Sequence, residues 1–308
     1  MESKNQKSQK TDVYQIITDR IITELEKGSV PWRKPWAEAG LPQNLITKRH
    51  YRGINVWLLA LLGFPYNYFL TEKQLKEIGG KVKRDERGMP VVYWNWKEVI
   101  DEGSGEKKQV PFLRYYIVYN IDQCEGIPVE SCPDFSEKEN NPIQRCEEVI
   151  EGMPKKPLIK FREQKAFYNP LLDFVNMPKL KTFENSERYY ETFFHELVHS
   201  TGHLSRLNRK ELMNMEEFGG DAYSIEELIA EMGACYLKSL CGFDHLGYDQ
   251  NASYLQGWLS KLKGDRHFVI YAASKAQHAV DFILKFQPEE KEVKIDEEAS
   301  DDEKELVS

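Results

Sequence analysis

The feature that most constrains this chain is the run from Phe193 to His203, which reads FFHELVHSTGH. It contains the pattern HExxH at residues 195–199. Two histidines four residues apart lie on one face, one turn apart, when the segment is helical. The adjoining face carries apolar side chains suited to a core, at Tyr190, Phe193, Phe194, Leu197 and Val198. We therefore expect a helix with one buried face and two imidazoles directed toward a common point.

Two imidazoles at this spacing can bind one Zn²⁺ at about 2.0–2.1 Å. Glu196 would then project beside the metal, where its carboxylate can take a proton from a bound water. We predict that His195 and His199 bind one Zn²⁺ per chain and that Glu196 is the catalytic residue of a zinc-dependent metallopeptidase. The alternative is a chance HExxH on a core helix, so the prediction needs a third ligand.

Three candidates for the third ligand can be compared. The longer pattern HExxHxxGxxH would require histidine where the chain has Ser205, which excludes that class of zincin. His203 could reach the metal only if the helix continued past Gly202. The run EELIAE at 226–231 offers carboxylates on a later helix, and it resembles the ExxxD pattern of glutamate-ligand zincins.

We predict that Glu227 is the third ligand. In the ExxxD pattern the second acid, one turn further on, holds a ligating histidine by its other ring nitrogen. We assign that role to Glu231, and the roles of Glu227 and Glu231 could be exchanged. Ordinary surface charge on a helix is the competing interpretation of EELIAE. No residue is assigned to the stabilisation of an oxyanion.

Charge is distributed unevenly along the 308 residues. Residues 1–125 contain 20 Lys and Arg against 16 Asp and Glu, a balance of +4, and residues 126–308 contain 22 against 34, a balance of −12. A basic half followed by an acidic half suggests two domains with different partners. We expect an α+β protein divided into a disordered N-terminus (1–10), a first domain (11–125), a linker (126–155), a zincin-like domain (156–287) and a disordered acidic tail (288–308).

Hydrophobic periodicity and turn residues predict the main elements of both halves. In the first half we expect helices near 11–28, with Thr11 as N-cap, near 55–63, and after a capping box at 71–74, then a hairpin through 81–99 turning at 85–88 and a strand at 109–121. In the second half we expect a short helix near 141–151 inside the linker, a strand at 157–161, a hairpin through 165–178, and helices at the HExxH run, 224–240, 249–263 and 268–286.

Tryptophan is concentrated in the basic half, where five of the six occur, several of them beside cations. Cations that follow phosphates, together with exposed rings that stack on unpaired bases, are typical of single-stranded DNA binding. Burial of some of these rings in the core is the alternative, above all for Trp57. No motif that reads duplex DNA is visible. The predicted DNA-binding residues are Trp32, Arg33, Lys34, Trp36, Lys48, Arg49, Tyr51, Arg52, Lys81, Lys83, Arg84, Trp94, Trp96 and Arg114.

The cysteines and the apolar segments indicate the cellular compartment in which the protein is expected. Five cysteines without a CxxC pair argue against a disulfide framework and for a reducing compartment. No apolar run marks a signal peptide near the N-terminus, and the longest apolar stretch, at 54–64, is too short to cross a bilayer. We expect a cytoplasmic protein without membrane contact, and the sequence predicts no particular oligomeric state.

Several segments resemble the ArdC-type antirestriction proteins of conjugative plasmids and other mobile elements. In the first half they are TDRIITELEKGSVPWRKPW, NLITKRHYRGINVW, FLTEKQLKEIGGKVKRDERGMPVVYW and LRYYIVYNIDQCEGIP. In the second half they are FFHELVHSTGHLSRLNR, YSIEELIAEMGACYL and ASYLQGWLSKLKGDRHFVIYAASKAQHAVDFIL. The resemblance runs from about residue 11 to 286 but does not extend to 126–155 or to the acidic tail. It implies a single-stranded-DNA-binding domain followed by a zincin-like metallopeptidase domain, and protection of incoming DNA from host restriction.

We therefore expect an antirestriction protein that binds single-stranded DNA and cleaves a host protein, whose peptide pairs antiparallel to the strand around KAFYNP or LDFVNM. Two other functions remain open. The chain could be a DNA-binding protein with a non-catalytic, structural zinc site, in which case Glu196→Gln would leave protection intact. It could also be a regulatory protease that cleaves a DNA-associated repressor.

Overall fold

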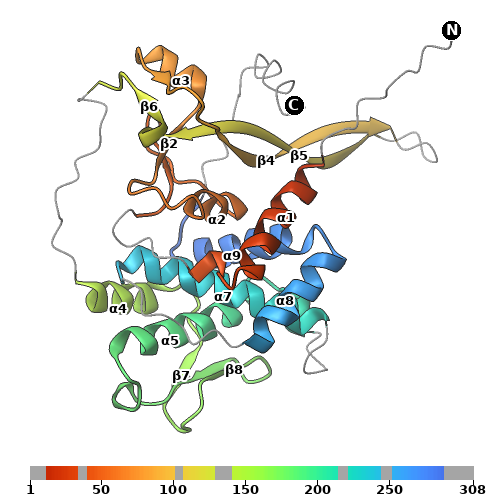
Figure 1. Ribbon diagram of the computed structural model, residues 1–308. Coiled ribbons are helices and arrows are strands. Elements are labelled where there is room, and N and C mark those ends of the chain that lie inside the picture. Colours follow the sequence, from red (N-terminus) through yellow and green to blue (C-terminus); the bar gives the residue numbers. More distant parts are fainter. Residues whose placement is uncertain are drawn as a thin grey trace.

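The computed structural model describes residues 12–33, 40–100, 107–128, 141–213, 221–243 and 252–287 (Figure 1). Within these ranges the side chains of 33, 95–100, 108–112, 213, 221–224 and 252–255 are not described. Figure 1 shows a long β hairpin on one side of a group of packed helices and a small sheet on the other side. The architecture is α+β with two domains, as predicted.

The N-terminal half begins with helix α1 (Val13–Glu26), close to the helix predicted over 11–28. Its N-cap is Asp12 rather than Thr11, which lies outside the described residues. The side chain of Asp12 accepts hydrogen bonds from the backbone N–H groups of Tyr14 and Gln15, which satisfies two donors that a helix start leaves unpaired. Helices α2 (Ile54–Ala60) and α3 (Glu72–Glu77) follow, and α3 opens with the predicted capping box.

A long antiparallel hairpin forms most of the first sheet. Strands β4 (Met89–Ile100) and β5 (Lys107–Asn120) pair from Met89–Val118 to Ile100–Lys107. Strand β2 (Tyr68–Leu70) pairs with β5, and β1 (Gln43–Asn44) pairs with β2, which gives the order β1-β2-β5-β4. Buried side chains from both strands of the hairpin, among them Val91 and Val118, form a small core with Phe69.

The hairpin predicted through residues 81–99 is wrong. Strand β3 (Lys81–Val82) pairs with β6 (Cys124–Glu125), and β4 pairs with β5 instead. The chain does turn where the sequence predicts, and Asp85 has a positive φ of 64°. A turn of this kind reverses the chain without deciding which strands pair. The longer β5 offers β4 a far more extensive ladder than the two-residue β3 can.

Among the described residues, the C-terminal half contains a three-stranded sheet beside four long helices and a short one. Strands β7 (Leu158–Lys160), β8 (Phe167–Asn169) and β9 (Phe174–Asn176) form a sheet in the order β7-β9-β8, and β8–β9 is the predicted hairpin. The helices are α5 (Ser186–Thr201), the short α6 (Lys210–Met213), α7 (Asp221–Cys241), α8 (Ala252–Gly264) and α9 (Phe268–Ile283). Helix α7 lies between α5 and α9 and contacts both (Figure 1).

The largest hydrophobic core is built from both halves. It includes Ile17 and Ile21 of α1 and Trp57 of α2, together with Val198 of α5 and Val280 of α9. Helix α1 lies against α8, and α2 lies against α9. Among the described residues, no helix combines the length and apolar composition needed to span a membrane.

Part of the predicted linker belongs to this core. The helix expected near 141–151 forms as α4 (Pro142–Gly152), and its Cys146 and Ile150 are buried with residues of α7 and α9. Its apolar residues recur at helical spacing, which indicates packing rather than a connecting segment. Residues 129–140 of the predicted linker lie outside the described residues.

The crossing of α5 and α7 depends on one glycine, and this leads to a prediction. A Cβ added to Gly233 of α7 would lie 2.7 Å from Cγ2 of Val198, inside the HExxH segment of α5. Gly233→Ala should therefore push the two helices apart and lower the free energy of unfolding by about 1–3 kcal/mol. Chemical denaturation measures this change.

A matched control is Gly257→Ala in α8, where a Cβ would meet nothing within 4 Å. Alanine is a better helix former than glycine, so this variant should be neutral or up to about 1 kcal/mol more stable. Equal stability changes in the two variants would contradict the proposed role of Gly233.

Candidate metal centre and nucleic-acid interface

The two histidines of the HExxH motif project from one face of α5, as predicted. The helix begins at its N-cap Asn185, whose side chain accepts a hydrogen bond from Arg188 N–H, and ends at Gly202. The Nε2 atoms of His195 and His199 lie 3.0 Å apart. His199 is buried and His195 is half-buried, so the pair lies at the edge of the core, where a ligand can approach.

Glu227 of α7 completes the group. Its carboxylate lies 3.5 Å from Nε2 of both His195 and His199, and the three donor atoms lie within 4.8 Å of one another. Two imidazoles and one carboxylate are the donor set of a catalytic-type divalent metal site with one position left for water. The three side chains therefore fit a divalent metal, and the structure brings together the three residues that the sequence predicted as ligands.

A buried ion pair between Glu226 and Arg209 supports the Nδ1 side of the His199 ring, and it was not predicted from the sequence. Nδ1 of His199 lies 3.1 Å from a carboxylate oxygen of Glu226, and the other oxygen of Glu226 accepts from Nε of Arg209 at 3.0 Å. Glu226 and Arg209 are both buried. Consecutive residues on a helix point about 100° apart, so Glu226 can reach Nδ1 while its neighbour Glu227 faces Nε2. The two adjacent acids, Glu226 and Glu227, are the sequence feature from which this support of His199 could have been predicted.

Arg209 also closes the end of α5, the helix that carries the HExxH motif. Its guanidinium donates to the carbonyl of Val198 at 2.8 Å and to the hydroxyl of Thr201. The last carbonyls of a helix lack partners within the helix, so Arg209 satisfies that of Val198 while it neutralises Glu226. One side chain therefore positions both the helix that carries the histidines and the carboxylate that orients His199.

The carboxylate expected to hold a ligating histidine was Glu231. For His199 this role falls on Glu226, because Glu226 provides the oxygen next to Nδ1. Burial lowers the pKa of His195, but its hydrogen bond to Glu227 and the negative charges of Glu196 and Glu231 outweigh burial and raise this pKa above its ordinary value. His203, the weaker candidate for a ligand, lies outside the donor group, and its Nδ1 is 2.9 Å from the hydroxyl of Ser205.

The charges of the cluster favour a cation. Burial lowers the pKa of His199, but the carboxylates of Glu226 and Glu227 outweigh burial and raise this pKa to about 10. Burial raises the pKa of Glu227, but hydrogen bonds to the two histidines outweigh it and hold this pKa well below its usual range. Burial likewise raises the pKa of Glu226, and the charge of Arg209 and the contact with His199 reverse that effect. The carboxylates therefore stay ionised beside the imidazoles.

A second polar cluster fixes the small sheet to the end of α5. The guanidinium of Arg206 is hydrogen-bonded to both carboxylate oxygens of Asp173, to the hydroxyl of Tyr168 at 3.2 Å, and to the carbonyl of Ser200 at 2.6 Å. Tyr168 belongs to β8, and Asp173 directly precedes β9. This cluster therefore ties the β8–β9 hairpin to the C-terminal end of the helix that carries the HExxH motif.

The predicted DNA-binding residues separate into three groups. The side chains of Lys48, Arg49, Lys81, Lys83, Arg84 and Arg114 are exposed, and so is the ring of Trp94. Lys34 and Trp36 lie outside the described residues, as do the side chains of Arg33 and Trp96. Of the remaining three predictions, Trp32 and Tyr51 need correction, and Arg52 is held in an ion pair.

Trp32 and Tyr51 are buried, so they cannot stack on a base. The ring of Trp32 is 1% exposed and packs edge-on against Trp258 at 5.2 Å, and Tyr51 packs edge-on against Phe69 at 6.1 Å. Arg52 is ion-paired with Asp281 of α9, and its guanidinium lies over the ring of Phe286. Trp32 and Arg52 therefore join the two halves of the chain, and Tyr51 packs against the first sheet. The sequence PWRKPW does not distinguish a buried ring from an exposed one.

The fold and the site define a zincin-like metallopeptidase domain joined to an N-terminal α+β domain. A family model described as a zincin-like metallopeptidase matches residues 145–275, and one described as the N-terminal domain of the anti-restriction factor ArdC matches residues 11–119. The chain belongs to the ArdC antirestriction family.

Solved structures of a relative agree over the whole domain arrangement. The metal-free crystal structure of the antirestriction protein ArdC from plasmid R388 is 37% identical, covers 90% of this chain and 98% of its own, and superposes with a TM-score of 0.72. A Mn(II)-bound structure of the same protein is 35% identical, covers 91% of this chain and 100% of its own, with a TM-score of 0.72.

Curated relatives include two proteins named DNA primase TraC from Escherichia coli, each 31% identical to this chain over 90% of its length. The chain spans 20% of one and 27% of the other. The uncharacterized protein y4eC of Sinorhizobium fredii is 30% identical over 89% of this chain and 92% of its own length.

Proposed function

We propose that the chain is a single-stranded-DNA-binding antirestriction protein whose zincin-like domain is a metal-dependent peptidase, with zinc as the metal. The observation that carries the proposal is the convergence of His195, His199 and Glu227 within 4.8 Å. Glu226 and Arg209 hold the donor side chains in place before an ion binds. An ion bound by these side chains would therefore occupy a fixed position. A bound Zn²⁺ would lower the pKa of its water to about 7 and polarise a peptide carbonyl.

The residues of the chain divide the remaining work. His195, His199 and Glu227 would hold the ion, and Glu226 keeps Nε2 of His199 directed at it by accepting a hydrogen bond from Nδ1–H. Glu196 follows His195 directly and is buried at the same edge of the core. Its carboxylate is the group that would take a proton from the attacking water and pass it to the leaving amine.

Strand β8 is the favoured docking site for a substrate peptide. The two predicted sites were the segments KAFYNP and LDFVNM, which contain β8 and β9. Strand β9 lies between β7 and β8 and is paired on both sides, whereas β8 is at an edge of the sheet. An extended peptide can add to an edge but not to a central strand. Strand β8 also contacts α5, so we keep KAFYNP and discard LDFVNM.

The DNA-binding part of the proposal depends on the exposed cations and on Trp94. The cations lie on the loop at 45–49, on β3 and the loop after it, and on β5. Exposed cations of this kind bind phosphates in a salt-dependent way. The relative from plasmid R388 is an antirestriction protein, which fits a role in protecting DNA that enters a cell. We propose that protection requires both DNA binding and cleavage of a host protein.

Glu196→Gln tests the peptidase part of the proposal. The variant should keep about one metal per chain and its affinity for single-stranded DNA, but lose at least about 100-fold in peptide hydrolysis because the general base is gone. The biological measurement is the transfer of an unmodified plasmid into a restricting recipient, with wild type and Glu196→Gln supplied at equal levels. We expect protection to be lost.

Full protection by Glu196→Gln would overturn the peptidase proposal and leave a DNA-binding protein with a non-catalytic metal site. A control is Glu163→Gln in the exposed loop before β8, which should behave as wild type. Loss of protection in this control as well would mean that the assay does not report the chemistry of Glu196.

A further inference from the structure

Three rings from distant parts of the chain meet on the surface. Tyr14 of α1 lies 4.4 Å from His267, in the turn between α8 and α9, and 6.4 Å from Trp94 of β4, measured between ring centroids. We call Tyr14, Trp94 and His267 the ring cluster. Trp94 is 48% exposed, whereas the other tryptophans with described side chains, Trp32, Trp57 and Trp258, are buried. The ring cluster therefore joins the two halves and presents an open aromatic face.

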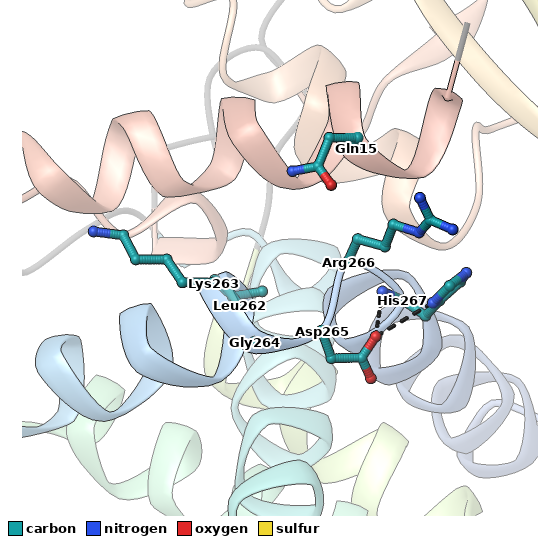
Figure 2. Close-up of a pocket in the computed structure, with 7 residues that line it drawn as sticks. All are labelled: Gln15, Leu262, Lys263, Gly264, Asp265, Arg266 and His267. Atoms are coloured by element: carbon teal, nitrogen blue, oxygen red, sulfur yellow. Dashed lines mark hydrogen bonds and ion pairs between the residues drawn. The ribbon is translucent and has the colours of Figure 1, made fainter. Parts of the chain in front are cut away.

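A pocket adjoins the ring cluster. It is lined by Gln15 of α1 and by residues 262–267 of the α8–α9 turn, including His267 itself (Figure 2). Figure 2 shows Gln15 on α1 opposite the side chains of the turn, with Asp265 directed toward His267. The turn is held to α1 because the hydroxyl of Thr18 donates to the carbonyl of Arg266 at 2.8 Å. Aromatic and polar groups are thus fixed in place before a ligand arrives.

The cations beside the pocket are paired only at the surface. Arg266 pairs with Asp12, and Lys263 pairs with Glu26 at 2.6 Å. The four side chains of these pairs are between 34% and 56% exposed. Exposed ion pairs contribute about 0–1 kcal/mol, so a phosphate can replace either carboxylate at little cost. Asp265 is a further acid at this site. Its carboxylate accepts a hydrogen bond from the backbone N–H of His267 at 2.8 Å.

We propose that single-stranded DNA crosses from the N-terminal half onto the α8–α9 turn, with an unpaired base stacked on the ring cluster and a phosphate bound by Arg266. The zincin-like half then supplies part of the DNA-binding surface. This inference rests on the proposed single-stranded-DNA-binding function. A duplex does not fit this site, because stacking on a side-chain ring requires an unpaired base.

The test is a titration of the full chain with a fluorescent single-stranded probe of about 20 nucleotides, a length above the site size of one binding domain, at several salt concentrations. Trp94→Ala and His267→Ala should each weaken binding about fivefold or more, the loss expected for one stacked base. Asp12→Asn should strengthen binding severalfold, because it releases Arg266 while asparagine still caps α1. The log–log slope of the dependence on salt should stay the same, because Arg266 binds the same phosphate in both proteins.

The matched controls are Phe161→Ala and Arg162→Ala, an exposed ring and an exposed cation in the loop after β7. These should bind the probe as wild type does. Tight binding by wild type with no change in His267→Ala or Asp12→Asn would overturn the inference and leave the proposed function standing. No binding by wild type would overturn both. Asp12→Asn and His267→Ala change side chains at the surface, so the test does not depend on a variant that fails to fold.

Discussion

Replacing His199 with alanine should leave the protein without its divalent metal. His199 provides one of the three donors, and the two that remain cannot bind the ion strongly enough to replace its hydration water. Loss of a residue that merely orients a ligand already lowers metal affinity by about 10–100-fold, so loss of the ligand itself should exceed about 100-fold. Metal analysis of the purified protein should fall from about one ion per chain to nearly none.

Glu227→Gln should give a similar loss, since it removes the anionic donor and keeps the size of the side chain. His203→Ala is the control, because His203 lies four residues beyond His199 but outside the donor group. It should retain the full metal content. Metal retained in His199→Ala, or lost equally in His203→Ala, would contradict the assignment of His195, His199 and Glu227 as the site. The competition between zinc and manganese for the wild type would identify the preferred metal.

Replacing Arg209 with methionine should cost about 3–5 kcal/mol of unfolding free energy, because it leaves the carboxylate of Glu226 buried without its cation. Arg209 and Glu226 are both buried, and Arg209 also closes the end of α5. Denaturant unfolding of the metal-free protein measures the loss. Lys27→Met is a control, since Lys27 pairs with Glu24 at the surface and should contribute at most about 1 kcal/mol.

The double variant Arg209→Met with Glu226→Gln should recover part of this loss, because no unpaired charge then remains in the core. Equal stability of Arg209→Met and wild type would contradict the role of the ion pair. Metal affinity of Glu226→Gln should still fall about 10–100-fold, since His199 loses the carboxylate that orients it.

The same pair predicts a dependence on pH. The pKa of Glu226 in the folded protein lies below its ordinary value of 4.5, so its stabilising contribution is fully present above that value. It is lost as the pH falls through the lower, folded pKa, because the unfolded chain takes up the proton first. The stability difference between wild type and Arg209→Met should therefore narrow as the pH drops below about 4.5. A difference that stays constant with pH would contradict this explanation.

Local pattern in the sequence was enough to predict several parts of the molecule. The HExxH helix and the capping box of α3 depend on spacings of three or four residues, and helical geometry converts such spacings directly into positions in space. The carboxylate on a later helix was expected from the chemistry of a third ligand. The β8–β9 hairpin likewise follows from two short strands on either side of a turn. In each case the residues that interact are neighbours along one element, or the chemistry allows few alternatives.

Other features depended on which elements meet, and only the tertiary structure decided them. The pairing of β4 with β5 rather than β3, the burial of Trp32 against Trp258, and the support of His199 by Glu226 and Arg209 all join residues from separate elements. The same is true of the ring cluster, where Tyr14, Trp94 and His267 come together. A side chain at such a position has the same local sequence whether it is buried or exposed. Its role is set by the packing of distant helices and strands, which local spacing does not specify.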